Sequence, residues 1–78
     1  MAIAYCLIGT KPGTEKDVAR ELRKDREIAE LHGIFGEYDI IFKIEVENQK
    51  TLGDYIAKLN AKKDDRTLEI KVLPPNFL

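Results

Sequence analysis

The clearest strand in the chain is Asp39-Ile40-Ile41-Phe42-Lys43-Ile44-Glu45-Val46-Glu47. One face of this strand carries Ile40, Phe42, Ile44 and Val46, and the other carries Ile41, Lys43, Glu45 and Glu47. Alternation with a period of two is typical of a strand that is buried on one side. This stretch therefore predicts one strand of a sheet with a covered face and a second, partly charged face.

The neighbouring segments extend this strand into a hairpin and a helix. Ile28 to Phe35 alternates loosely and contains Gly33, which predicts a second strand with a bulge near the glycine. Gly36, Glu37 and Tyr38 form the connection between the two strands. After a polar break at residues 48–50, apolar residues recur at i, i+3, i+4 and i+7, which predicts a half-buried helix ending near residue 62 or 63. Those apolar residues are Leu52, Tyr55, Ile56 and Leu59.

The two ends of the chain add two strands and a helix. The stretch from Ala2 to Thr10 is apolar at both its odd and its even positions, which predicts a strand covered on both faces. A helix is expected over roughly residues 14 to 25, opened by a weak capping box of Thr14 and Asp17. The last strand runs from Arg66 to Leu73 and is ended by two prolines, Pro74 and Pro75.

The order of elements is βαββαβ, which predicts an α+β, ferredoxin-like fold with a four-stranded antiparallel sheet and two helices on one face. Leu68, Ile70 and Val72 are expected on the helix side of the last strand. The second face has an apolar centre, to which Ile41 belongs, and a rim of Lys43, Glu45, Glu69 and Lys71. This pattern favours an isologous dimer, a dimeric α+β barrel, although antiparallel sheets can also leave one face in water.

The length and the charge of the chain limit its possible organisation and functions. Seventy-eight residues allow one domain, residues 1–78, and a single cysteine allows no internal disulfide, so association between copies is expected to add stability. Thirteen basic against fourteen acidic residues give a net charge of −1, which argues against direct nucleic-acid binding. No stretch has the pattern of a signal peptide or membrane span, and a cytoplasmic location is expected.

Few residues are suited to catalysis. The chain has one histidine, His32, and one cysteine, Cys6, without ligand-type partners at a familiar spacing. We therefore expect no metal site, no cofactor and no catalytic residues, and interpret the chain as a binding module rather than an enzyme. The enzyme alternative is a small dimeric α+β barrel oxygenase or isomerase with His32 in its pocket.

The junction Gly36-Glu37-Tyr38-Asp39 is the most informative stretch for binding. Glycine lets main-chain donors approach a carboxylate, and Asp39 can accept hydrogen bonds from an ammonium group, so the junction suits the two ends of an amino acid. The alternative interpretation is a hairpin turn in which Asp39 caps nearby backbone groups.

With its surroundings, this stretch resembles the RAM domain, the effector-binding and oligomerisation domain of the Lrp/AsnC family of feast/famine regulators. The resemblance rests on residues 4–8, the Pro12-Gly13 turn, residues 36–44, residues 52–59 and residues 67–73. It implies ferredoxin-like homodimers that assemble further, often as tetramers of dimers, with amino-acid effectors bound between dimers. Carried over, it makes Gly36, Tyr38, Asp39 and, more weakly, Thr67 the ligand-binding candidates.

Family members usually carry a helix-turn-helix domain, for which this sequence leaves no room. The resemblance is therefore to a stand-alone RAM domain that acts through protein contacts, by co-assembling with full-length Lrp/AsnC-type regulators. The second alternative is a structural assembly protein without any ligand.

Overall fold

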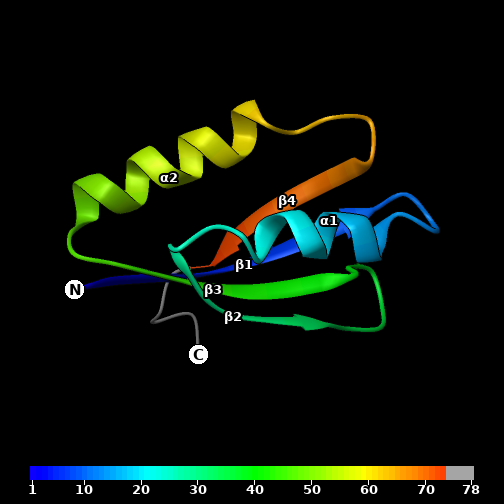
Figure 1. Ribbon diagram of the computed structural model, residues 1–78, viewed down its shortest axis with the longest axis horizontal. Coiled ribbons are helices and arrows are strands. Elements are labelled where there is room, and N and C mark those ends of the chain that lie inside the picture. Colours follow the sequence, from blue (N-terminus) through cyan, green and yellow to red (C-terminus); the bar gives the residue numbers. More distant parts are fainter. Residues whose placement is uncertain (74–78) are drawn as a thin grey trace.

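The elements follow the order that the hydrophobic pattern predicts, in a computed structural model that describes residues 1–73 (Figure 1). They are β1 (Ala2–Thr10), α1 (Glu15–Leu22), β2 (Ile28–Gly33), β3 (Ile40–Val46), α2 (Gln49–Ala61) and β4 (Thr67–Leu73). Both helices lie on the same side of the sheet. The ferredoxin-like βαββαβ prediction is confirmed.

The sheet is antiparallel and has the strand order β2-β3-β1-β4, so β1 and β3 are central. Cys6 lies opposite Phe42 on β3 and opposite Val72 on β4. Directly opposed residues share a face, so the even-numbered residues of β1 and β3 point towards the helices. The odd-numbered residues of β1 point to the other side.

The core lies between the helices and the two central strands. Its buried members are Ala2, Ala4, Cys6, Ile8, Val18, Leu22, Ile40, Phe42, Ile44, Leu52, Tyr55 and Leu59. The predicted buried faces of β3 and α2 are therefore confirmed, apart from Val46 and Ile56, which are only partly buried. The helix α2 begins where the Asn48 side chain accepts a hydrogen bond from the Thr51 backbone N–H at 2.8 Å.

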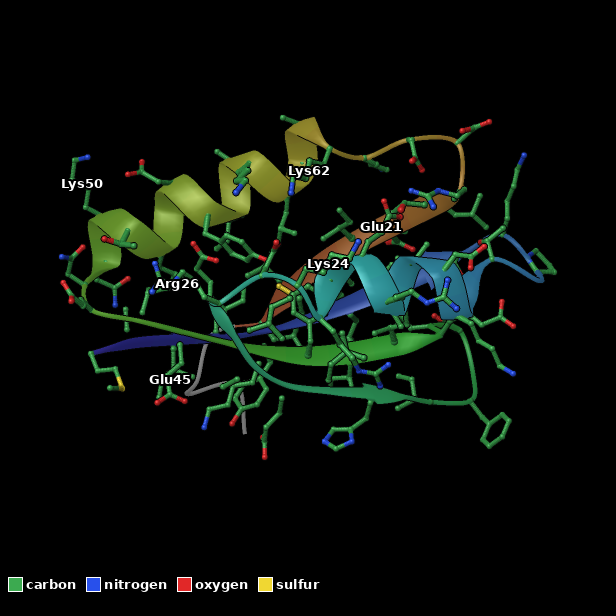
Figure 2. The ribbon with its side chains drawn as sticks, viewed as in Figure 1. Glu21, Lys24, Arg26, Glu45, Lys50 and Lys62 are labelled. Atoms are coloured by element: carbon green, nitrogen blue, oxygen red, sulfur yellow. The ribbon has the colours of Figure 1, made fainter. Side chains whose placement is uncertain are left out.

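The opposite side of the sheet, called the open face below, is covered by no helix or further strand within residues 1–73. Its centre consists of Ile3, Tyr5, Leu7 and Ile41, and its rim of Lys43, Glu45, Glu69 and Lys71. Lys43 and Glu45 form an ion pair at 3.5 Å on this rim. Figure 2 shows Glu45 projecting away from the two helices.

The structure corrects the predicted burial of β4. Leu68 is 60% exposed and Val72 is 37% exposed, whereas both were expected to be covered by the helices. The reason is that α2 packs mainly against β1 and β3, and α1 has only eight residues. Most of the helix side of β4 therefore remains accessible in the single chain.

Three local predictions also differ from the structure. Thr14 does not cap α1 with its side chain; its hydroxyl instead donates to the Lys11 carbonyl at 2.8 Å. The helix ends at Leu22, three residues before the expected end. The irregularity of β2 lies between Ile28 and Glu30 rather than near Gly33. The expected stop at Pro74 and Pro75 lies outside the described residues.

Candidate functional site

The segment that connects β2 to β3 contains one glycine with a positive φ. Gly36 has φ +118°, a region that residues with a Cβ rarely adopt. No atom lies within 4 Å of an ideal Cβ at this position, so the requirement for glycine comes from the backbone and not from crowding. Ile34 closes the connection by donating its N–H to the Asp39 carbonyl at 2.9 Å. A connection at Gly36 was predicted, but it is longer than expected, because β2 ends at Gly33 rather than at Phe35 and β3 begins at Ile40.

Asp39 ties this junction to the end of β1. Its backbone N–H donates to the Ile8 carbonyl at 2.9 Å. Its Oδ2 atom accepts from the Thr10 backbone N–H at 2.7 Å and from the Thr10 hydroxyl at 3.3 Å. Asp39 therefore caps a backbone group, but this group lies on β1, 29 positions away in the sequence, and not in the local turn where the capping was expected. The other oxygen, Oδ1, makes no hydrogen bond within residues 1–73 and can accept one from a ligand.

Tyr38 lies on the open face. A Cβ at Gly9 would meet its Cδ1 atom at 3.9 Å, so the ring lies above this glycine of β1. Gly9 is opposite Glu69 on β4. Partial burial, and then the Glu69 carboxylate, raise the pKa of the Tyr38 phenol. Tyr38 therefore reaches across β1 towards β4.

Thr67 is joined to Asp39 only through Thr10. Thr67 and Thr10 are opposed in the β1–β4 register, and Thr10 holds the Asp39 carboxylate. The three residues cluster at the end of the sheet where β1 ends and β3 and β4 begin. However, Thr67 and Asp39 line different hollows, on different sides of α1.

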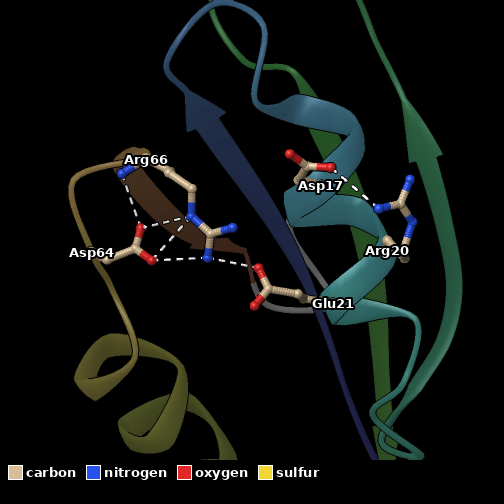
Figure 3. A network of polar contacts seen from close by, with 5 residues as sticks. All are labelled: Asp17, Arg20, Glu21, Asp64 and Arg66. Carbon is tan, nitrogen blue, oxygen red and sulfur yellow. Dashed lines mark hydrogen bonds and ion pairs between the residues drawn. The ribbon is translucent and has the colours of Figure 1, made fainter.

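Asp39 faces a groove between α1 and the sheet, with a volume of about 550 Å³, called the α1–β2 groove below. Gly33, Leu31 and Ile40 form its sheet side. Its helix side carries three cations, Lys16, Arg20 and Arg23, and one carboxylate, Glu15. Arg20 forms an exposed ion pair with Asp17 at 3.3 Å (Figure 3). Lys16 and Arg23 make no ion pair with any other residue that the structure describes.

The three cations were not identified from the sequence. Their spacing of i, i+4 and i+7 places them along one side of α1. This spacing is the feature of the sequence from which a basic helix face could have been predicted. Together with the free oxygen of Asp39, they give the groove an acceptor for an ammonium group and donors for a carboxylate. The arrangement suits a small zwitterion. Gly36 and Tyr38 do not line the groove.

The described residues do not form a catalytic or metal centre. His32 is exposed on the open face, opposite Ile41. Cys6 is fully buried, and desolvation raises the pKa of its thiol to about 12, so it stays protonated and unreactive at neutral pH. No group of three or more His, Cys, Asp and Glu residues within 1–73 is placed to hold a metal ion. In the same range, no helix is long and apolar enough to cross a membrane.

Solved structures support the fold. The crystal structure of FFRP-DM1 and the hypothetical protein PHS023 from Pyrococcus horikoshii each superpose with a TM-score of 0.84 and 29% identity over 94% of this chain. The matches cover 96% and 87% of those chains. TTHA0845 from Thermus thermophilus, at 16% identity and a TM-score of 0.81 over 94% of this chain and 90% of its own, shares the fold alone.

Sequence comparison identifies the family. The HTH-type transcriptional regulators FL11 of Pyrococcus horikoshii and Pyrococcus furiosus are 33% and 35% identical to the chain over 54 residues. The match covers 69% of this chain but only 36% of each regulator. The model of the Lrp/AsnC ligand binding domain matches residues 3–71. The expectation of a ligand-binding module rather than an enzyme is thereby confirmed, and the chain belongs to the family of Lrp/AsnC ligand-binding domains.

Proposed function

We propose that the chain is a regulatory effector-binding module that binds a free amino acid, or a similar small zwitterion, beside Asp39. The observation that carries the proposal is that Asp39, whose Oδ1 atom makes no hydrogen bond within residues 1–73, lines a groove whose other wall holds Lys16, Arg20 and Arg23. The ammonium group of the ligand binds Asp39, and its carboxylate binds the cations of α1.

The position of Asp39 makes it a suitable anchor for an ammonium group. Its backbone N–H and its Oδ2 atom are both bonded to β1, so the carboxylate is held in place before a ligand arrives. Preorganisation of this kind lowers the entropic cost of binding. The ligand needs to supply only one further donor to Oδ1.

The second part of the proposal concerns assembly. A second copy covers the open face, because this face has the apolar centre and mixed-charge rim of a self-complementary surface. Tyr38 and Gly36 belong to the boundary with other copies, since Tyr38 lies on the open face and Gly36 is exposed at the junction. Their contribution to ligand binding, and that of Thr67, stay predictions, as does further assembly into tetramers of dimers.

The regulatory step is a population shift in which the ligand favours the assembly that binds it better. The named relatives are HTH-type transcriptional regulators, so full-length Lrp/AsnC-type regulators are the proposed partners. This chain would change their assembly by joining it through the open face.

The test is light-scattering mass determination across the twenty amino acids, with calorimetric titration of each of them. Asp39→Asn keeps an acceptor for Thr10 but removes the charge, and we expect affinity to fall roughly tenfold or more. Asp54→Asn, an exposed carboxylate on α2, is the matched control and should bind normally. Leu7→Lys should yield monomers, because it places a charge at the centre of the open face.

Each outcome separates one part of the proposal from the others. Unchanged affinity in Asp39→Asn removes the groove from the binding site. A constant mass without heat of binding, for all twenty amino acids, favours a structural assembly protein without a ligand. Dimers that persist in Leu7→Lys show that another surface carries the assembly.

A further inference from the structure

A second hollow lies on the other side of α1, between α1, the end of α2 and the start of β4. This α1–α2 cavity has a volume of about 250 Å³. Its apolar lining consists of Ile8, Val18, Leu22, Leu59 and Ile70. At about 30 Å³ per water the volume equals roughly eight waters, which leaves room for a branched aliphatic amino acid.

A cluster of ion pairs stabilises one wall of the cavity. The Arg66 guanidinium lies 2.6 Å from Glu21 of α1 and 2.9 Å from Asp64 (Figure 3). The Arg66 carbonyl also accepts from the Lys11 backbone N–H at 2.8 Å. These contacts fix the segment between α2 and β4 relative to α1. Arg66, Glu21 and Asp64 pair with one another, so they fix the wall of the cavity and are not available to bind a ligand.

Asp25 supplies an acceptor that is already oriented. The Tyr55 hydroxyl donates to its Oδ2 atom at 2.6 Å. Burial, and then the Asp25 carboxylate, raise the pKa of Tyr55, so the hydroxyl remains a donor throughout the neutral pH range. One oxygen of Asp25 is therefore used, and Oδ1 makes no hydrogen bond within the described chain.

Lys62 and Lys63 supply the opposite charge. They line the cavity at the end of α2, and neither forms an ion pair within residues 1–73. Figure 2 shows Lys62 at the end of α2 and Glu21 on α1. Within residues 1–73, the cavity is thus lined by a carboxylate with one oxygen that makes no hydrogen bond, by two unpaired ammonium groups and by aliphatic side chains.

We infer that the α1–α2 cavity is a second ligand site within each protomer, for an α-amino acid with a branched aliphatic side chain. The ammonium group of the ligand binds Asp25, its carboxylate binds Lys62 and Lys63, and its side chain packs on the aliphatic floor. The inference shares its ligand class with the proposed function, but it depends on different residues.

The test is a titration of the 78-residue chain with L-leucine, followed by NMR of isotope-labelled Ile, Leu and Val methyl groups. We expect saturable shifts at Val18, Leu59 and Ile70. Asp25→Asn should weaken binding roughly tenfold or more, because it keeps the acceptor for Tyr55 but loses the charge. L-aspartate should bind more weakly than L-leucine, because its side chain would place a charge on the aliphatic floor.

A second pair of variants tests the volume of the site. Ile70→Phe fills part of the cavity and should abolish the shifts at Val18 and Leu59. Leu68→Phe, on the same strand but 60% exposed and outside the cavity, is the matched control and should bind as the unmodified chain does.

The result distinguishes this inference from the proposed function. Shifts confined to Leu31 and Ile40 of the α1–β2 groove, lost in Asp39→Asn, would overturn the inference and leave the proposed function intact. Shifts confined to the α1–α2 cavity would support the inference and remove the groove as the binding site. An absence of methyl shifts at both places with leucine, isoleucine and valine overturns the inference.

Discussion

Replacing Asp39 by alanine removes the acceptor that holds the end of β1. Thr10 is only 5% exposed, and its backbone N–H donates to the Asp39 carboxylate at 2.7 Å. A hydrogen bond to a charged group contributes about 1.5–3 kcal/mol, and a buried donor left without an acceptor costs a similar amount. We therefore expect Asp39→Ala to lower the free energy of unfolding by about 2 kcal/mol.

This loss is large enough to measure as a change in melting temperature. For a domain of 60–100 residues, 1 kcal/mol corresponds to about 4–8 °C, so Asp39→Ala should melt roughly 8–16 °C lower. The assay is thermal unfolding followed by circular dichroism. All variants are compared at one protomer concentration, because assembly makes the melting temperature depend on concentration.

Asp39→Asn is the informative control, since its amide oxygen can still accept from Thr10. This variant should lower the free energy of unfolding by only about 1 kcal/mol, which is the difference between a charged and a neutral hydrogen bond. If Asp39→Ala melts within about 2 °C of the unmodified chain, the bond to Thr10 does not stabilise the fold and the capping role assigned to Asp39 is wrong.

Two further predictions concern the core. Tyr55→Phe removes the hydroxyl that donates to Asp25 at 2.6 Å, and it should lower the free energy of unfolding by about 2 kcal/mol in urea titrations. The buried Cys6 thiol has a pKa of about 12, against 9.0 ordinarily. The unfolded chain loses this proton first, so the free energy of unfolding should fall with rising pH above about 9, by up to ~1.4 kcal/mol per pH unit. Urea titrations at about pH 8, 9 and 10 would measure this slope.

Both predictions have direct controls. Tyr55→Phe combined with Asp25→Ala should cost less than the sum of the single changes, and strict additivity would show that the two side chains do not interact. Cys6→Ala should remove the decrease between about pH 9 and 10. A decrease that persists in Cys6→Ala would assign it to other groups.

The sequence predicted those parts of the fold that depend on local periodicity. The alternation of Ile40, Phe42 and Ile44 and the helical spacing of Leu52 and Tyr55 both describe what a single element buries. All of these residues are buried in the structure. The order of elements then restricts the topology to a few arrangements, of which the ferredoxin-like one was correct.

The incorrect predictions concern the placement of elements relative to one another. Leu68 and Val72 alternate like core residues, yet their exposure depends on where α2 lies over the sheet. The capping of Thr10 by Asp39 joins residues 29 positions apart, which no local pattern encodes. The α1–β2 groove and the α1–α2 cavity are likewise products of how α1 sits on the sheet, and were not foreseen.

The bond between Asp39 and Thr10 has a consequence for how a sensor of this design would respond. It joins the α1–β2 groove to β1, whose Tyr5 and Leu7 lie on the open face. If an amino acid beside Asp39 strengthens assembly by some factor, assembly must raise the affinity for that amino acid by the same factor. The amount of the protein in the cell would then set the ligand concentration at which it responds, so that changing its expression alone would retune its sensitivity.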